Sequence, residues 1–127
     1  MTRAKAWILG LVTSVAVVGT ALAATAPSAP SGPVSTTAGQ VTTYTVSLPE
    51  SALNEGFVSI TLNWGDGASS RLGWLNGTVV NGVRTWTFKH AWTLPRTSPA
   101  GKYYTLRTDV VYPSSVAHSS LVVFVHP

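Results

Sequence analysis

The chain has 127 residues, of which 45% are hydrophobic and only 9% are charged, and its formal net charge at pH 7 is +4. This length fits one ordinary domain. The sequence has no cysteine, which excludes disulfide bonds, thiolate catalysis, cysteine-ligated zinc and a lipid anchor on cysteine. Its eight Lys and Arg residues are scattered singly, without the basic run that would follow a phosphate backbone, so nucleic acid is not an expected partner.

Residues 1–23 have the three-part layout of a signal peptide. Arg3 and Lys5 give a positively charged start, an uncharged apolar stretch follows over residues 6–19, and Ala21-Leu22-Ala23 is an A-x-A cleavage site. We expect cleavage after Ala23, which predicts a secreted or extracellular protein with no membrane-embedded part. The alternative is an uncleaved signal anchor at the cell surface, because the apolar stretch is almost long enough to span a bilayer.

Residues 24–33 form a tract rich in Pro, Ser and Ala that has no large apolar side chain. Such a tract has little surface to bury in return for being ordered, and its prolines favour extended conformations. The composition therefore predicts a flexible tail in front of the folded domain, which we expect to occupy residues 34–127.

Within residues 34–127, apolar side chains recur at every second position between turn sequences. Four stretches show this alternation with Thr, Ser or charged residues on the other face, which is typical of strands packed on one side: 43–48, 58–64, 85–92 and 104–112. A last strand at 116–125 contains five consecutive apolar residues, and we expect it to be buried on both sides. Asn81-Gly82 between two valine-rich stretches predicts a hairpin with a type I′ turn.

The domain shows no amphipathic helical pattern. About seven short strands predict an all-β fold, namely a two-sheet antiparallel β-sandwich of the immunoglobulin-like class preceded by a signal-peptide helix, and a closed barrel is the alternative. In this arrangement Trp64, Trp86 and Trp92 share the inward parity of their strands and belong to the core.

The stretch Asn63-Trp64-Gly65-Asp66-Gly67 resembles the signature of the PKD domain (polycystic kidney disease repeat), in which an aromatic residue precedes Gly-Asp-Gly at a strand end. In that family a His-x-Tyr element follows, and then Gly-x-Tyr opens the next strand. Here His90-Ala91-Trp92 and Gly101-Lys102-Tyr103 stand in that order. The resemblance covers about residues 34–126 and implies a PKD-like β-sandwich whose loops these residues shape.

Two features depart from that family. Trp92 stands where the family has Tyr, so the hydrogen bond of a tyrosine hydroxyl is lost or reassigned. The stretch between Gly67 and His90 is also longer than in compact members, by enough for the extra Asn81-Gly82 hairpin.

The residues of the motif have a physical interpretation of their own. Gly65 and Gly67 permit positive φ on both sides of Asp66, whose carboxylate can accept nearby backbone N–H groups in an Asx turn. The second interpretation is that Asp66 is a calcium ligand. Calcium requires about six to eight oxygen ligands, and the neighbouring residues do not supply the alternating carboxylates of a calcium loop. We therefore expect a loop-shaping role, with no metal and no cofactor.

Catalytic arrangements find no support in the sequence. His90, His118 and His126 are not spaced as zinc ligands, and no G-x-S-x-G nucleophile motif is present. The chain has four carboxylates, of which Glu50 and Glu55 flank one loop, so a pair for glycoside cleavage is not indicated. We expect that the protein is not an enzyme.

Three functions remain open. The first is a secreted, non-catalytic interaction or adhesion module that binds an extracellular protein or glycan. The second is a carbohydrate-binding domain in which an exposed Trp74 stacks on a sugar ring, although Trp74 could instead cap one end of the sandwich. The third is a surface subunit that self-associates through poorly charged edge strands. Asn76-Gly77-Thr78 also matches the N-glycosylation sequon.

Overall fold

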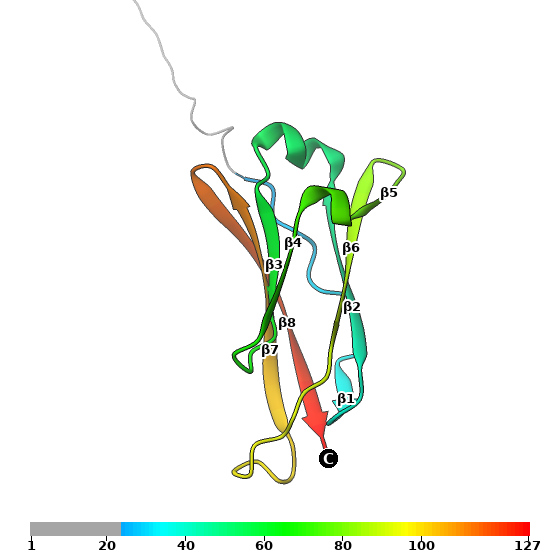
Figure 1. The fold of residues 1–127 in the computed structure, drawn as a ribbon, viewed down its shortest axis with the longest axis vertical. Coiled ribbons are helices and arrows are strands. Elements are labelled where there is room, and N and C mark those ends of the chain that lie inside the picture. Colours follow the sequence, from blue (N-terminus) through cyan, green and yellow to red (C-terminus); the bar gives the residue numbers. More distant parts are fainter. Residues whose placement is uncertain (1–23) are drawn as a thin grey trace, which may run out of the picture.

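The computed structural model describes residues 24–127, and the predicted signal peptide lies outside them. The described part is mostly β (Figure 1). Two short 3-10 helices, η3 (Glu50–Glu55) and η4 (Trp74–Asn76), interrupt the strands, and no helix in residues 24–127 has the length and apolarity to cross a membrane. The strands are β1 (Ser35–Thr37), β2 (Thr42–Pro49), β3 (Ser59–Asn63), β4 (Ser69–Leu72), β5 (Thr78–Val80), β6 (Val83–His90), β7 (Lys102–Tyr112) and β8 (Ser115–His126).

The strands form two separate sheets, and not the single closed barrel that was the alternative. One sheet has five strands in the order β1-β8-β7-β3-β4, and the other has three in the order β2-β6-β5 (Figure 1). All pairs are antiparallel except β1 and β8, which are parallel, so the prediction of purely antiparallel sheets is wrong for this pair. β1 and β8 come from opposite ends of the domain, so no hairpin forces them to run in opposite directions.

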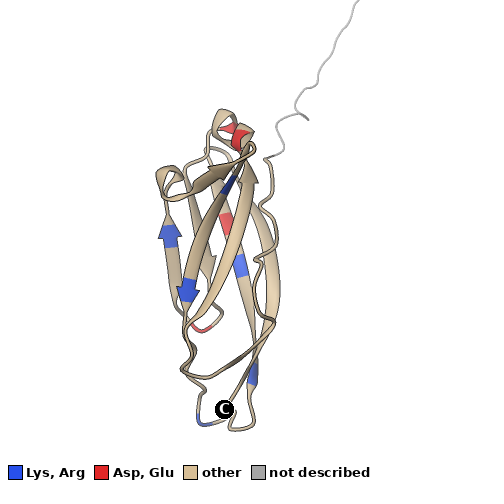
Figure 2. Cartoon of the chain, turned by 90° about the vertical axis from the view of Figure 1, so that its right-hand side faces the viewer, with Lys and Arg blue, Asp and Glu red and all other residues tan. Residues whose placement is uncertain are grey.

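Charged side chains are few on both sheets. The Lys and Arg residues of the described chain are spread singly over β4, β6, β7 and the loop between β6 and β7, and the blue segments of Figure 2 lie apart from one another. Where charges do gather on the described surface, they include both signs, as in the contact of Arg84 with Glu50 and that of Arg107 with Asp109.

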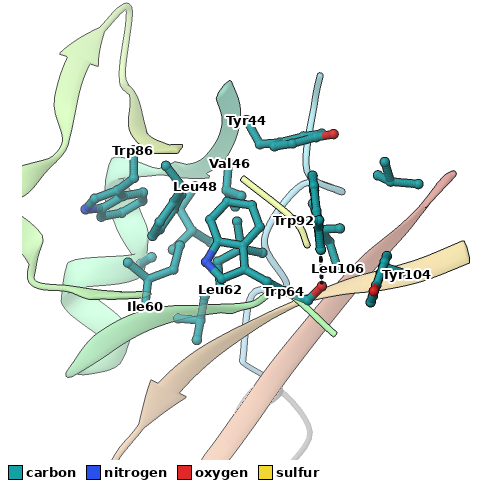
Figure 3. Packing of buried hydrophobic residues seen from close by; sticks show 14 of the residues in the cluster. Tyr44, Val46, Leu48, Ile60, Leu62, Trp64, Trp86, Trp92, Tyr104 and Leu106 are labelled. Carbon is teal, nitrogen blue, oxygen red and sulfur yellow. Dashed lines mark hydrogen bonds between the residues drawn. The ribbon is translucent and has the colours of Figure 1, made fainter. Parts of the chain in front are cut away.

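The core lies between the two sheets and is rich in aromatic rings (Figure 3). Trp64, Trp86 and Trp92 are each 0% exposed, which confirms their predicted inward orientation. Trp64 and Trp92 meet edge to face with ring centroids 5.8 Å apart, and Tyr44 packs on Trp64 in the same manner at 5.9 Å. Edge-to-face packing of this kind stabilises a core beyond the area that it buries.

The predicted hairpin is confirmed between β5 and β6. Asn81 and Gly82 have φ angles of 51° and 76°, the left-handed pair that a type I′ turn requires. The prediction for the last strand is wrong in one respect. Val123 and Val125 of β8 are buried, but Val122, which points to the other face of the sheet, is 53% exposed, because no layer of the described chain covers this outer face.

Residues 24–33, which we call the N-terminal strap, differ from the expected flexible tail. The strap runs beside β2, where Ser31 and Thr45 exchange backbone hydrogen bonds of 2.8 and 3.0 Å and the Ser28 amide donates to the Ser47 carbonyl at 3.0 Å. Pro27 is buried, as is the proline three residues further on. Sequence reasoning sought large apolar side chains, whereas here the proline rings supply the buried surface.

Candidate functional site

The loop between β3 and β4 has the conformation that its glycines predict. Gly65 and Gly67 have φ angles of 84° and 94°, and the amide of Ala68 donates to Asp66 Oδ1 at 3.0 Å, which closes an Asx turn. The Trp64 amide donates to the Ala68 carbonyl at 3.1 Å, so the loop is tied at its base. This geometry accords with the loop-shaping interpretation of the motif.

Motif residues at or just after the end of β3 in one sheet and of β6 in the other come together at this loop. His90, at the end of β6, donates from Nε2 to Asp66 Oδ2 at 2.7 Å. Its ring stacks on Trp64 with centroids 4.6 Å apart and planes 12° from parallel, and the ring of Trp92 meets His90 edge-on at 5.0 Å. The fold thus joins the Gly-Asp-Gly loop of the five-stranded sheet to the end of β6, at His90, in the three-stranded sheet.

The contacts of Asp66 account for its ionisation. Partial burial by itself raises the pKa of a carboxyl, but the hydrogen bonds from His90 and Ala68 outweigh this effect and hold the pKa of Asp66 below its ordinary value. The negative charge in turn adds to burial in raising the pKa of Tyr104. Asp66 is therefore an ionised acceptor whose two oxygens both have protein donors.

Trp92, the residue that departs from the PKD pattern, has a hydrogen bond of its own. Its indole Nε1 donates to the backbone carbonyl of Trp64 at 3.1 Å, drawn as the dashed line in Figure 3. Both residues are fully buried, so this bond satisfies a carbonyl that would otherwise lack a partner in the core.

The other two motif residues lie apart from this cluster. Gly101 has a φ of 119°, and a side chain there would collide with the ring of Phe124. Tyr103 is 70% exposed on the outer face of the five-stranded sheet, where its ring contacts Phe124 at 4.8 Å. Tyr103 is therefore accessible at the surface, unlike the core residues of the motif.

A shallow pocket of about 350 Å³ opens beside the Gly-Asp-Gly loop. Lys102 and Asp66 give it charges of both signs, and the Lys102 ammonium lies 5.3 Å from the centroid of the Tyr104 ring. Residues 24–127 contain no group of three His, Asp or Glu side chains that could hold a metal ion. The lining residues are Gly65, Asp66, Thr93, Leu94, Pro95, Lys102 and Tyr104.

Trp74 is partly buried, which favours the interpretation that it caps one end of the sandwich over that of an exposed platform. Its ring meets Phe57 and Trp86 edge to face at 5.0 and 5.7 Å, and the guanidinium of Arg84 lies 4.5 Å from the ring centroid. Arg84 is held there by Glu50 and by the carbonyl of Trp74 itself. With these neighbours Trp74 closes one end of the core, as the second interpretation of this residue proposed.

Sequence reasoning missed a polar cluster on the outer face of the five-stranded sheet. Asp109 on β7 accepts from Arg107 Nε at 2.8 Å and from His118 Nδ1 at 2.6 Å, and Asn63 on β3 donates to its other oxygen at 3.2 Å. The alternation of Arg107 and Asp109 signals that they share a face. The register that brings His118 and Asn63 beside them is set only when the three strands pair.

The same outer face carries an apolar patch, which we call the outer-face patch and define as Tyr103, Val122 and Phe124. Tyr103 and Phe124 are directly opposed in the β7–β8 ladder, and Val122 lies two residues from Phe124 on the same side of β8. Tyr103 and Val122 are both more than half exposed.

Comparison with known proteins adds no relative. No protein-family model matches the chain, and a search of curated proteins finds none that is similar to it.

Proposed function

We propose that the protein is a secreted, non-catalytic interaction module, built as a PKD-like β-sandwich of the immunoglobulin class and exported by a signal peptide that is cleaved after Ala23. The strand order supports the fold assignment. The order β2-β6-β5 corresponds to strands B-E-D of an immunoglobulin-type domain, and β8-β7-β3-β4 corresponds to G-F-C-C′. The strap and β1 together take the place of the first strand, divided between the two sheets.

The motif residues support the PKD-like part of the proposal. The motif residues lie far apart in the sequence, and direct contacts between them in the fold would explain why they occur together. Asp66, His90 and Trp64 do so through a 2.7 Å hydrogen bond and a stacked pair of rings, and Trp92 ties itself to the Trp64 carbonyl. These contacts hold two loops of the sandwich together at one end.

The observation that carries the proposed function is the outer-face patch. An exposed tyrosine beside a phenylalanine and a valine forms a flat aromatic surface, and aromatic residues are enriched where proteins bind partners. The polar cluster around Asp109 lies further along the same face, as a polar rim lies beside the apolar centre of an interface. The partner we propose is an extracellular protein or glycan surface.

A binding experiment with matched variants tests this function. Secreted protein from the full chain is immobilised, and surface material from the producing cells is applied after either protease or polysaccharide-degrading treatment. We expect binding that falls at least tenfold, which is about 1.4 kcal/mol, in a variant carrying Tyr103→Ser and Val122→Ser. The control is Val41→Ser, which removes an exposed valine from the loop before β2. The proposal fails if neither fraction binds, or if the double variant binds as the wild type does.

Self-association is the second candidate function, and an apolar group near the β5 edge favours it. Among the strands of residues 24–127, β5 pairs only with β6, and Val80 is exposed, as are Leu75 before it and Val83 after it. An uncovered edge with apolar side chains is prone to pair with another chain. Val80→Lys should then shift an oligomer toward monomer in sedimentation velocity. A wild-type protein that sediments as a monomer at every concentration would remove this candidate.

A further inference from the structure

The N-terminal strap is held at its start by two side chains that contact one residue. Glu55 of η3 accepts from the Thr25 amide at 2.8 Å with one oxygen and from the Thr25 hydroxyl at 2.6 Å with the other. The Tyr112 hydroxyl of β7 donates to the Thr25 carbonyl at 2.8 Å. Every polar group of Thr25 therefore has a partner, although Glu55 is itself an exposed surface residue.

The strap remains attached beyond this point. Ser119 of β8 donates to the Ser28 carbonyl at 2.7 Å, and the Ser47 amide of β2 donates to the Ser28 hydroxyl at 2.9 Å. Further along, the Tyr44 hydroxyl donates to the Pro33 carbonyl at 2.6 Å. The strap is thus a fixed part of the domain, and its first residues lie directly after the predicted cleavage site.

Cleavage after Ala23 changes the charge at this point. Before cleavage the Ala24 nitrogen is a neutral amide, and after cleavage it is an α-ammonium group. Successive backbone nitrogens lie about 3 to 4 Å apart, so the Ala24 nitrogen lies within about 7 Å of the Glu55 carboxylate that accepts from Thr25. Opposite charges at this distance attract, and they do so modestly at an exposed site.

We propose that Glu55 and Tyr112 form a niche that binds the N-terminus created by signal cleavage, so that processing adds an ion pair between the Ala24 ammonium and Glu55 that fastens the strap. The inference rests on the proposed cleavage after Ala23. The strap lies beside β2 at the edge of the three-stranded sheet, so the added ion pair secures that edge.

The proposal predicts a pH dependence. Among the residues that contact the start of the strap, the titratable side chains are Glu55 and Tyr112, and Ser119 is neutral. Burial and the negative charge of Glu55 raise the pKa of Tyr112 to about 12, so it stays a neutral donor. An α-amino group has an ordinary pKa of about 7.7 to 8.0, which a nearby carboxylate raises. The added stability is therefore present below about pH 8 and disappears as pH rises through the higher folded-state pKa.

The test uses protein secreted from the full chain, with each mature N-terminus identified by mass spectrometry. One variant has Gly-Ser inserted between Ala23 and Ala24, which moves the ammonium away from Glu55. We expect this insertion to lower the melting temperature by roughly 2 to 5 °C at pH 6 and by much less at pH 10. In a Glu55→Gln background the insertion should have no effect, whereas in an Asp109→Asn background its effect should persist.

A direct measurement covers the case in which Glu55→Gln fails to fold. Nuclear magnetic resonance titration of the Ala24 amine in the wild-type protein should give a pKa above the ordinary range, and a pKa within or below that range overturns the niche. The niche is also overturned if the insertion lowers stability equally with and without Glu55→Gln. A mature terminus other than Ala24 overturns the cleavage assignment and with it the niche. The proposed binding function is tested by the outer-face patch variants, whose result does not depend on the position of the terminus.

Discussion

Gly65 and Gly67 allow a matched test of the β3–β4 loop. Both have positive φ angles, 84° and 94°, so alanine is strained at either position. They differ in the space around them. A Cβ atom at Gly65 would lie 2.8 Å from the carbonyl oxygen of Thr105 and 3.2 Å from its amide nitrogen, whereas a Cβ at Gly67 would have no atom within 4 Å.

This difference sets the expected magnitudes. The left-handed backbone costs an alanine about 1 to 2 kcal/mol, and this applies to both glycines. At Gly65 the clash adds about 1 to 3 kcal/mol, because the atoms it meets belong to the backbone of the central strand β7 and cannot rotate away. We therefore expect Gly65→Ala to lower the free energy of unfolding by about 2 to 5 kcal/mol and Gly67→Ala by about 1 to 2 kcal/mol.

Urea denaturation followed by tryptophan fluorescence measures both variants. Fluorescence suits this region because Trp64, which directly precedes Gly65, is buried. The expected result is a lower midpoint for Gly65→Ala than for Gly67→Ala, with similar slopes, since a changed slope would indicate an altered denatured state. Equal losses in the two variants would refute the steric argument, because only the backbone conformation is common to both positions.

Three further predictions concern individual contacts. The pKa of Asp66 lies below its ordinary value of 3.8, so its ionised form contributes stability above pH 3.8, and this stability is lost as the pH falls through the folded-state pKa. In an acid titration of the free energy of unfolding, Asp66→Asn should therefore reduce the loss of stability below about pH 4. Trp92→Phe should lower the free energy of unfolding by about 2 to 4 kcal/mol in thermal denaturation, because the buried Trp64 carbonyl loses its donor; a loss below 1 kcal/mol would contradict this. Arg84→Met should destabilise by about 1 to 3 kcal/mol in the same assay, whereas Arg71→Met on an exposed edge should change stability by less than about 0.5 kcal/mol.

Local pattern was enough to predict much of the fold. The alternation at residues 43–48 and 104–112 corresponds to β2 and β7, and the buried tryptophans follow from the same parity. The dipeptide Asn81-Gly82 was sufficient to predict the turn between β5 and β6. These features depend on neighbours within a few residues, because side chains alternate along a strand and a two-residue turn has only a few allowed conformations.

Contacts between distant segments could be decided only by the tertiary structure. The strap shows this, because its prolines gain a buried surface only when β2 is beside them. The hydrogen bond between His90 and Asp66 and the polar cluster around Asp109 arise in the same way, from strands that pair across long stretches of chain. The sequence left Trp74 open between an exposed platform and a cap on the core, and in the structure Arg84 and two aromatic rings surround it at one end of the core. Periodicity indicates which face of a strand is apolar, but the neighbour across that face is set when all the strands pack together.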